Sequence, residues 1–271
     1  MKLTKIVFNS LLVLAVIIMA ACSNSTDAEE DQWQLIWQDE FDGPAGQSPN
    51  PEHWTFDIGT DWGNAQLEYS TDRPENVSLD GQGNLAIIAR QESYEGRNYT
   101  SGRITTQDIF EPTFGKFEAR MQLPWGSGIW PAFWLLGANV NEVGWPQCGE
   151  IDIMEYRGQE PSRIHGSLHG PGYSGAEPVT SRYDLYNDRF DTGFHLFAVE
   201  WSENLIKWYV DGTLYQTVRA DDVPGTWVYD HPFYIILNLA VGGNYVGPPN
   251  GNTVFPQTLL VDYVRVYEKK N

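Results

Sequence analysis

Three carboxylates fall within six positions of an apolar segment, at Glu150, Asp152 and Glu155. The residues between them are two isoleucines and a methionine, so the segment predicts a strand in which an unpaired acid would be costly. Paired Asp or Glu side chains can hydrolyse a glycosidic bond, one as an ionised carboxylate and the other as a proton donor. The acids alone could equally bind calcium or face solvent at a strand edge.

The parity of these acids predicts an irregular strand. In a regular strand Glu150 and Asp152 share a face and Glu155 points to the other side. One extra residue, a β-bulge near Ile153 or Met154, returns Glu155 to the face of the other acids and turns Met154 inward. Glu150 and Glu155 would then be four strand positions apart, about 13 Å at Cα. Side chains that lean inward could bring the carboxyls to roughly 5 Å, the spacing of retaining glycoside hydrolases.

Cys148, two residues before Glu150, offers a different nucleophile. A reactive thiol needs a partner such as histidine that lowers its pKa, and no Cys-His pairing is legible in the sequence. A buried thiol usually packs as a small apolar group. We therefore expect Cys148 to be structural.

The first 22 residues predict an export signal. Two lysines precede an apolar run from Leu11 to Ala21, which is short for a membrane span. The Met-Ala-Ala-Cys sequence ending at Cys22 resembles a bacterial lipoprotein cleavage box, which would leave Cys22 as the lipidated first residue; ordinary secretion is the alternative. Residues 23–31 form a polar tether, and residues 32–269 are expected to form one catalytic domain.

Composition narrows the range of partners. The chain has 36 acidic and 17 basic residues, a net charge of -19, which repels nucleic acid and anionic membranes. We expect a monomer that contacts a membrane only through its lipid anchor. No phosphate-binding loop, His-Cys metal cluster or Ser-His-Asp arrangement is legible, so no cofactor for catalysis is expected.

Secondary-structure signals are almost wholly β. Lys116–Leu123 alternates apolar and polar residues, and Leu205–Val210 and Thr213–Val218 flank the turn Asp211-Gly212, a strong hairpin signal. Further short strands are expected at 33–40, 85–90, 194–201, 233–239 and 259–267. This pattern predicts an all-β jelly-roll sandwich of two antiparallel sheets, with a substrate cleft on the concave face and the first and last strands together.

Eleven tryptophans suggest a sugar-binding surface. Indole faces stack on the apolar faces of pyranose rings. Trp130 and Trp134, just before the acidic segment, are the candidates for substrate contact, and Trp145 lies in a glycine-containing turn. Trp201 and Trp208 fall within strand patterns, which indicates core packing.

The acidic segment resembles a known family. Gly149–Gly158, with the preceding Trp-Pro-Gln-Cys, resembles the active-site strand of glycoside hydrolase family 16. The extra Met154 resembles the bulged, laminarinase-like endo-1,3-β-glucanases, because lichenase-like members lack that residue. The likeness extends over nearly the whole mature chain, through the segments 99–104, 128–134, 194–201, 238–244 and 261–267.

The resemblance implies a mechanism. Glu150 is the nucleophile, Asp152 its electrostatic helper and Glu155 the acid/base in a retaining, endo-acting double displacement on β-1,3-glucan of the laminarin type. The alternatives are a hydrolase of mixed-linkage β-1,3-1,4-glucan or of an agar-type galactan, and a non-catalytic glycan-binding lipoprotein. Because a binding protein would have no need of all three acids, their presence favours catalysis.

The resemblance also implies a substrate-binding set. Asn64, Arg103, His169, Asn238 and Tyr245 match positions that bind substrate in the family. Tyr245 stands where the family frequently has Trp, which keeps an aromatic platform but changes the subsite. A lone histidine is more often structural than catalytic, which is the alternative for His169.

A structural calcium ion is the last implication. Asp262 matches an aspartate that binds calcium in many members of the family, with Glu40 and Gly83 as companions. Oxygen ligands suit calcium. The alternative is that Asp262 is an ordinary solvated strand residue.

Overall fold

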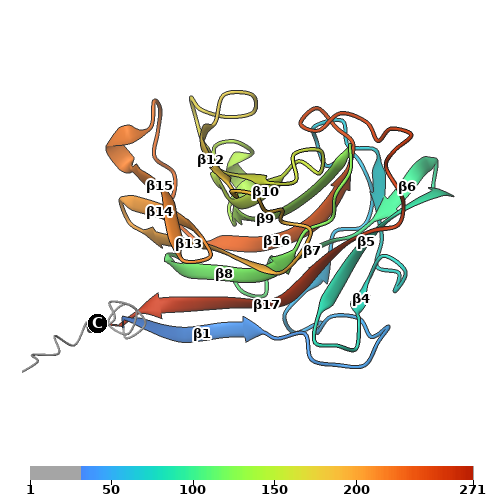
Figure 1. Ribbon diagram of the computed structural model, residues 1–271. Coiled ribbons are helices and arrows are strands. Elements are labelled where there is room, and N and C mark those ends of the chain that lie inside the picture. Colours follow the sequence, from blue (N-terminus) through green and yellow to red (C-terminus); the bar gives the residue numbers. More distant parts are fainter. Residues whose placement is uncertain (1–31, 271) are drawn as a thin grey trace, which may run out of the picture. The chain divides into compact units, whose positions relative to one another are not determined.

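The computed structural model describes residues 32–270 of the chain. Two sheets make up nearly all of its regular structure, which confirms the all-β jelly-roll prediction (Figure 1). Within the described residues the helices are one α-helix, α2 (Val140–Val143), and one 3-10 turn, η1 (Ala220–Asp222). Among residues 32–270 there is no helix with the length and apolar character of a membrane span. The expected leader, Cys22 and the tether lie outside the described residues.

The larger sheet has ten strands. Its order is β15 (Thr213–Arg219), β14 (Leu205–Val210), β13 (His195–Ser202), β8 (Gly115–Gln122), β17 (Gln257–Lys269), β5 (Leu85–Tyr94), β6 (Arg97–Ser101) and β3 (Glu68–Ser70), with β1 (Trp33–Asp39) paired to β17 and β4 (Val77–Leu79) paired to β5. Its pairs are antiparallel except β3 with β6.

The smaller sheet has seven strands and carries the acidic segment. Its order is β12 (Val179–Asp184), β11 (Arg163–His169), β10 (Glu150–Tyr156), β9 (Ile129–Gly137), β16 (Phe233–Val241), β7 (Arg103–Thr105) and β2 (Thr55–Phe56). The strand that holds the three acids, β10, lies between β9 and β11 by antiparallel pairing.

The core lies between the two sheets. Alternate residues of β8, such as Phe117 and Met121, are fully buried there, as the strict alternation of this segment predicts. Trp201 and Trp208 are also buried in this core, so their structural assignment is confirmed. Each large apolar side chain buried in this way contributes about 1.5–3 kcal/mol to folding.

Two local predictions are also confirmed. Asp211 and Gly212 both have positive φ, 49° and 76°, and connect β14 directly to β15. This is the conformation that a tight two-residue hairpin requires. The first strand, β1, runs antiparallel beside the last, β17, so the two ends of the domain are paired (Figure 1).

Candidate active site

A bulge interrupts β10 where the parity of the acids requires one. Against β9, Asp152 pairs with Trp134 and Glu155 with Ala132, and the register shifts between Asp152 and Met154. Because the β9 partners of Glu150, Asp152 and Glu155 are two residues apart in each case, all three acids lie on one face of the sheet. The extra residue, Met154, is fully buried in the core. The predicted bulge and its effect are confirmed.

A tryptophan from the opposite sheet fixes this bulge. The indole Nε1 of Trp208 donates to the backbone oxygen of Asp152 at 2.8 Å, and both groups are buried. A bulge interrupts the regular ladder of backbone hydrogen bonds, and a buried carbonyl left without a partner would be costly. Trp208 therefore supports the acid-bearing strand β10 from its core side.

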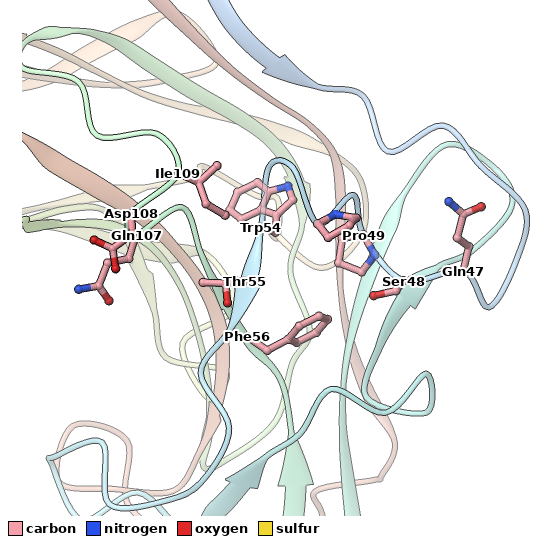
Figure 2. Close-up of a pocket in the computed structure, with 10 residues that line it drawn as sticks. Gln47, Ser48, Pro49, Trp54, Thr55, Phe56, Gln107, Asp108 and Ile109 are labelled. Carbon is pink, nitrogen blue, oxygen red and sulfur yellow. The ribbon is translucent and has the colours of Figure 1, made fainter.

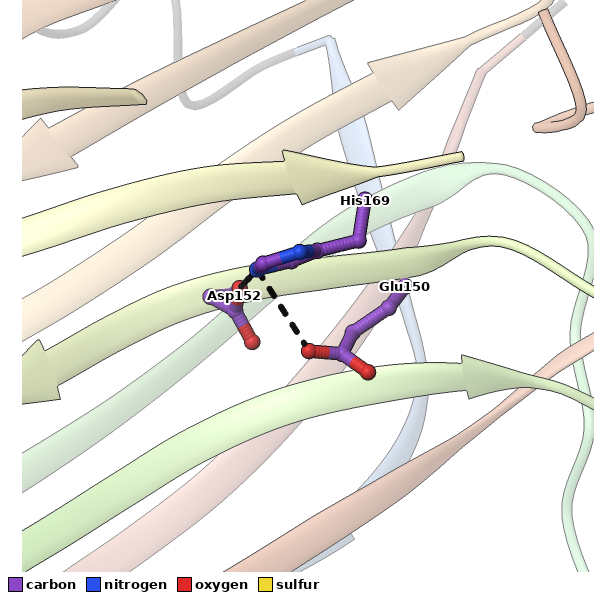
Figure 3. A group of neighbouring side chains, drawn as sticks. All are labelled: Glu150, Asp152 and His169. Carbon is purple, nitrogen blue, oxygen red and sulfur yellow. Dashed lines mark ion pairs between the residues drawn. The ribbon is translucent and has the colours of Figure 1, made fainter. Parts of the chain in front are cut away.

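The acids and His169 form a compact cluster. His169 Nε2 lies 3.2 Å from Asp152 Oδ2 and 3.7 Å from Glu150 Oε1 (Figure 3). Asp152 is only 2% exposed. On the other side of the ring, the backbone N-H of Gly175 donates to His169 Nδ1 at 3.1 Å. Because Nδ1 accepts this bond, the neutral ring carries its proton on Nε2 and presents it to the carboxylates.

Burial and the neighbouring charges shift the pKa of His169 in opposite directions. Burial lowers the pKa of its imidazole, but the carboxylates of Asp152, Glu150 and Glu155 outweigh burial and raise that pKa to about 9. Full protonation would place a second N-H against the Gly175 amide, so the cationic form loses that contact. The bond from Gly175 therefore favours the neutral form of His169, whereas the acids favour its cationic form.

The two glutamates have different environments. Burial and the charge of Asp152 raise the pKa of both carboxyls, Glu150 to about 8 and Glu155 well above its ordinary value. Glu150 Oε2 accepts a hydrogen bond from Trp145 Nε1 at 2.8 Å, whereas Glu155 Oε1 accepts a longer one, 3.2 Å, from Trp130. A shorter bond to an N-H donor favours ionisation more. Glu150 is thus the more easily ionised of the two, and Glu155 the better proton carrier.

The same cluster also has the composition of a metal site, because ligand atoms of Glu150, Asp152 and His169 lie within 4.8 Å of one another. A metal ion on His169 Nε2 would need that nitrogen deprotonated, with the ring proton moved to Nδ1. Nδ1 instead accepts the Gly175 amide proton. The hydrogen bonding therefore fits a carboxyl-histidine cluster better than a metal centre.

Cys148 does not provide a rival nucleophile. The thiol is fully buried, and burial together with the charge of Glu150 raises its pKa to about 11. It packs beside Leu136, Tyr234 and Ile236. Since only the thiolate is a good nucleophile, this cysteine is structural, as expected.

Arg103, Trp134 and Asn238 come together beside the acids. The Arg103 guanidinium lies between the rings of Trp62 and Trp134, 4.9 Å from each centroid, and its Nε donates to Asp57 Oδ2 at 2.6 Å. Trp134 Nε1 donates to Asn238 Oδ1 at 2.8 Å, which leaves the amide nitrogen of Asn238 free to face a ligand as a donor. Asp57 was not predicted, because no motif marks it in the sequence.

Tyr245 and Trp130 form a second aromatic group. Their ring centroids are 4.9 Å apart, and the guanidinium carbon of Arg157 lies 4.1 Å from the centre of the Tyr245 ring. The Tyr245 hydroxyl is 2.9 Å from Nδ1 of His165, the strand partner of Glu155. A tryptophan at position 245 could not make this hydroxyl contact, so the tyrosine hydroxyl helps to orient the ring.

Backbone hydrogen bonds join the loops that carry Asn64 and Tyr245. Asn64 has φ +51°, and its carbonyl accepts from Asn244 N at 2.7 Å. Glu68, which is 3% exposed, accepts from Val241 N at 2.8 Å through its side chain. The other six predicted substrate-binding residues have side-chain contacts at or beside the acid cluster. Asn64 is placed by its backbone next to the Tyr245 loop.

Replacing Glu68 with glutamine is expected to remove part of the pH dependence of stability. Burial raises the pKa of Glu68 from 4.5 to about 7, although the Val241 amide opposes this rise. The folded state therefore binds this proton more tightly than the unfolded chain, and the stability it contributes is lost as pH rises from 4.5 to 7, on the order of 3 kcal/mol. Urea unfolding between pH 4 and 8 measures this loss.

The exposed Glu52→Gln variant is the matched control for Glu68→Gln. The unfolding free energies of the wild type and Glu68→Gln should diverge as the pH rises, whereas those of the wild type and Glu52→Gln should stay parallel. Parallel curves for Glu68→Gln as well would contradict a raised pKa at this position.

Two of the expected calcium ligands form ion pairs with arginines. The Glu40 carboxylate pairs with the guanidinium of Arg265 through both oxygens, at 2.8 and 2.9 Å, and the Asp262 carboxylate pairs with Arg120. A calcium ion at Asp262 would compete with Arg120 for that carboxylate, whereas Glu40 and Gly83 would offer backbone carbonyl oxygens, which calcium also accepts. Calcium binding by Asp262, Glu40 and Gly83 stays a prediction.

A separate cavity of about 700 Å³ lies beside β2 (Figure 2). It is lined by residues of the segments 47–56 and 107–109, including Trp54, Phe56 and Ile109. Glu150, Asp152 and Glu155 do not line it, so it is distinct from the acid cluster.

Known proteins share both the sequence and the fold of this chain. It is 39% identical to a β-glucanase of Rhodothermus marinus, over 98% of this chain and 96% of that protein. The laminarinase catalytic domain of Thermotoga maritima is 46% identical, with a TM-score of 0.84 over 89% of this chain and all of that structure. The endo-β-1,3-glucanase of Pyrococcus furiosus is 47% identical, with a TM-score of 0.83 over 88% of this chain and 95% of that structure. Residues 57–259 match the family described as glycosyl hydrolases family 16. This chain therefore belongs to glycosyl hydrolase family 16.

Proposed function

We propose that this chain is an endo-acting, retaining β-1,3-glucanase of the laminarinase type. The observation that carries the proposal is the bulge at Met154, which places Glu150, Asp152 and Glu155 on one face while the two glutamates keep different proton affinities. Relatives that carry the names laminarinase and endo-β-1,3-glucanase, matched over most of this chain, support the same activity.

The reaction would proceed in two displacements. An oxygen of Glu150 attacks the anomeric carbon while the bond to the leaving glucosyl oxygen breaks, and Glu155 gives its proton to that oxygen. Water then attacks the glycosyl ester, Glu155 takes the proton of the water, and Glu150 is released. Asp152 and His169 would balance the charge on the two glutamates during both displacements. These steps use carboxyl groups and water, and they need no cofactor.

The substrate would lie on the acid-bearing face of the smaller sheet. On one side, Arg103 lies in β7 and Trp134 of β9 is paired with β16. On the other side, Trp130 donates to Glu155, and Tyr245 packs against Trp130. Aromatic and hydrogen-bonding groups therefore flank the acids. Such a mixture binds the apolar faces and the hydroxyls of neutral sugars. The net charge of -19 disfavours sulfated or uronic polymers.

Digestion of a polymer panel tests the substrate. Laminarin should be cut into a ladder of short oligosaccharides early in the reaction, with mixed-linkage β-1,3-1,4-glucan cut more slowly and agarose left intact. Fast cleavage of agarose with none of laminarin would reject the glucan substrate but keep the mechanism. Binding of laminarin without any cleavage would point to a glycan-binding protein instead.

We also propose that the mature protein is exported as a monomer and held on the cell envelope through a lipid on Cys22. The support for export and lipidation is the sequence pattern of residues 1–22 alone, and secretion without a lipid is the alternative. Metabolic labelling with palmitate, compared with the Cys22→Ala variant, distinguishes the two.

A further inference from the structure

Trp145 combines an exposed ring with a hydrogen bond to a catalytic group. The side chain is 46% exposed and lies in the loop between β9 and β10. Its one polar atom, Nε1, nevertheless donates to Glu150 Oε2 at 2.8 Å. An exposed indole can give its N-H to water, so its direction toward a carboxylate in the acid cluster needs a reason.

Packing and backbone bonds hold the indole in this place. The ring lies 5.9 Å from the His169 ring at an angle of 42°, on the side of the cluster where Gly175 binds His169. On the loop itself, Gly144 N donates to Val140 O and Cys148 N donates to Gly144 O, both at 2.9 Å. The loop that carries Trp145 is thereby tied just before the tryptophan and again just after it.

The contact makes the two oxygens of Glu150 unequal. Oε2 has the short bond to Trp145, whereas Oε1 is 3.7 Å from His169 Nε2, beyond the length of a good hydrogen bond. Oε1 is therefore the oxygen with the freer lone pair. A nucleophile with one oxygen held and the other free presents a single atom to the anomeric carbon.

We propose that Trp145 is a positioning residue for the nucleophile: its indole N-H holds Oε2 of Glu150 so that Oε1 attacks the sugar. This inference rests on the proposed retaining hydrolysis and adds a residue to it. Trp145 acts through Glu150, and it remains bonded to the same oxygen through both displacements.

The proposed contact has a role in each step. When Oε1 bonds to the anomeric carbon and the leaving oxygen takes the proton of Glu155, Oε2 becomes the carbonyl oxygen of the ester and still accepts from Trp145. When water attacks, the bond from the anomeric carbon to Oε1 breaks and its electron pair returns to the carboxylate. The N-H then stabilises the negative charge that develops on Oε2.

Trp145→Phe tests the proposal because phenylalanine keeps an apolar ring and lacks the N-H. Because the variant loses a hydrogen bond to a charged group, its kcat on the best substrate of the wild type is expected to fall by about 10- to 100-fold. Loss of the N-H also removes an interaction that lowers the pKa of Glu150, while Asp152, His169 and Arg103 still act on that carboxyl. The acid limb of the kcat/KM profile should therefore move to higher pH.

Trp125→Phe is the matched control. Trp125 is 48% exposed, and its ring stacks with Arg189 rather than with an acid of the cluster. This variant should keep the kcat and the acid limb of the wild type, and thermal unfolding should show that both variants are folded. A Trp145→Phe variant that raises KM with kcat and the acid limb unchanged would overturn the proposal, because the ring would then be only a sugar platform.

A measurement without substrate separates this proposal from the proposed function. The indole N-H resonance of Trp145, assigned by its absence in Trp145→Phe, should titrate with Glu150 and should lose that titration in Glu150→Gln. A resonance insensitive to both pH and Glu150→Gln would reject the contact, whatever polymer the enzyme cleaves.

Discussion

Replacing Glu150 with alanine is expected to lower kcat on laminarin by about 10⁴-fold or more. The variant has no carboxylate to form the glycosyl ester, and water must attack without the covalent step. Binding should change little, because Trp134, Arg103 and Asn238 retain their mutual contacts. Release of reducing sugar measures kcat, and calorimetry with a laminari-oligosaccharide measures binding.

The control for this variant is Glu142→Ala. Glu142 is an exposed glutamate of α2, in the loop that precedes β10. It should retain full activity, which separates the loss of a catalytic carboxylate from the loss of any nearby acid. Azide should restore turnover of an activated aryl glycoside by Glu150→Ala and yield the α-glycosyl azide. Normal hydrolysis of laminarin by Glu150→Ala would contradict the assignment of the nucleophile.

Replacing Glu155 with glutamine is expected to have an effect that depends on the leaving group. On laminarin the sugar leaves as a poor leaving group and needs the Glu155 proton, so kcat/KM should fall by about 10²- to 10⁴-fold. A dinitrophenyl leaving group needs no proton, so the first displacement should be nearly unaffected. Steady-state kinetics on both substrates measure the difference, and equal losses would contradict the acid/base role.

The pH profile gives a second measure of Glu155. Burial and the charge of Asp152 raise the pKa of this carboxyl well above its ordinary value, so the group still holds its proton near neutral pH. Activity should fall on the basic side as pH rises through this pKa and the proton is lost. The Glu155→Gln variant should lack that basic limb, because its amide does not titrate.

The bulge in β10 could be predicted from the sequence because it follows from the spacing of the three acids. Side chains alternate along any strand, so the spacing of Glu150, Asp152 and Glu155 required an extra residue whatever the rest of the fold. The isoleucines and Met154 indicated which side of the strand faces the core. No knowledge of the neighbouring strands was needed.

Contacts across strands could not be predicted in this way. The ion pairs of Asp262 with Arg120 and of Glu40 with Arg265 join residues 142 and 225 positions apart in the chain, and the sequence did not predict them. Periodicity along one strand contains no information about such partners.

The same limit applies to residues in loops. Trp145 could be recognised as an aromatic in a turn, but the direction of its N-H toward Glu150 depends on how the loop folds back. Asp57 has no motif at all and is placed by β2 against Arg103. The sequence therefore predicted the shared face of the three acids, whereas the contacts that surround them required the structure.

The anomeric form of the first product tests the central claim most directly. Proton NMR during early hydrolysis of laminarin by the wild-type enzyme should show the β-anomer at the new reducing ends first, with the α-anomer following only by mutarotation. Two displacements at one carbon, through an ester on Glu150, retain the configuration. Initial appearance of the α-anomer would show a single displacement by water and would contradict the role of Glu150 as nucleophile.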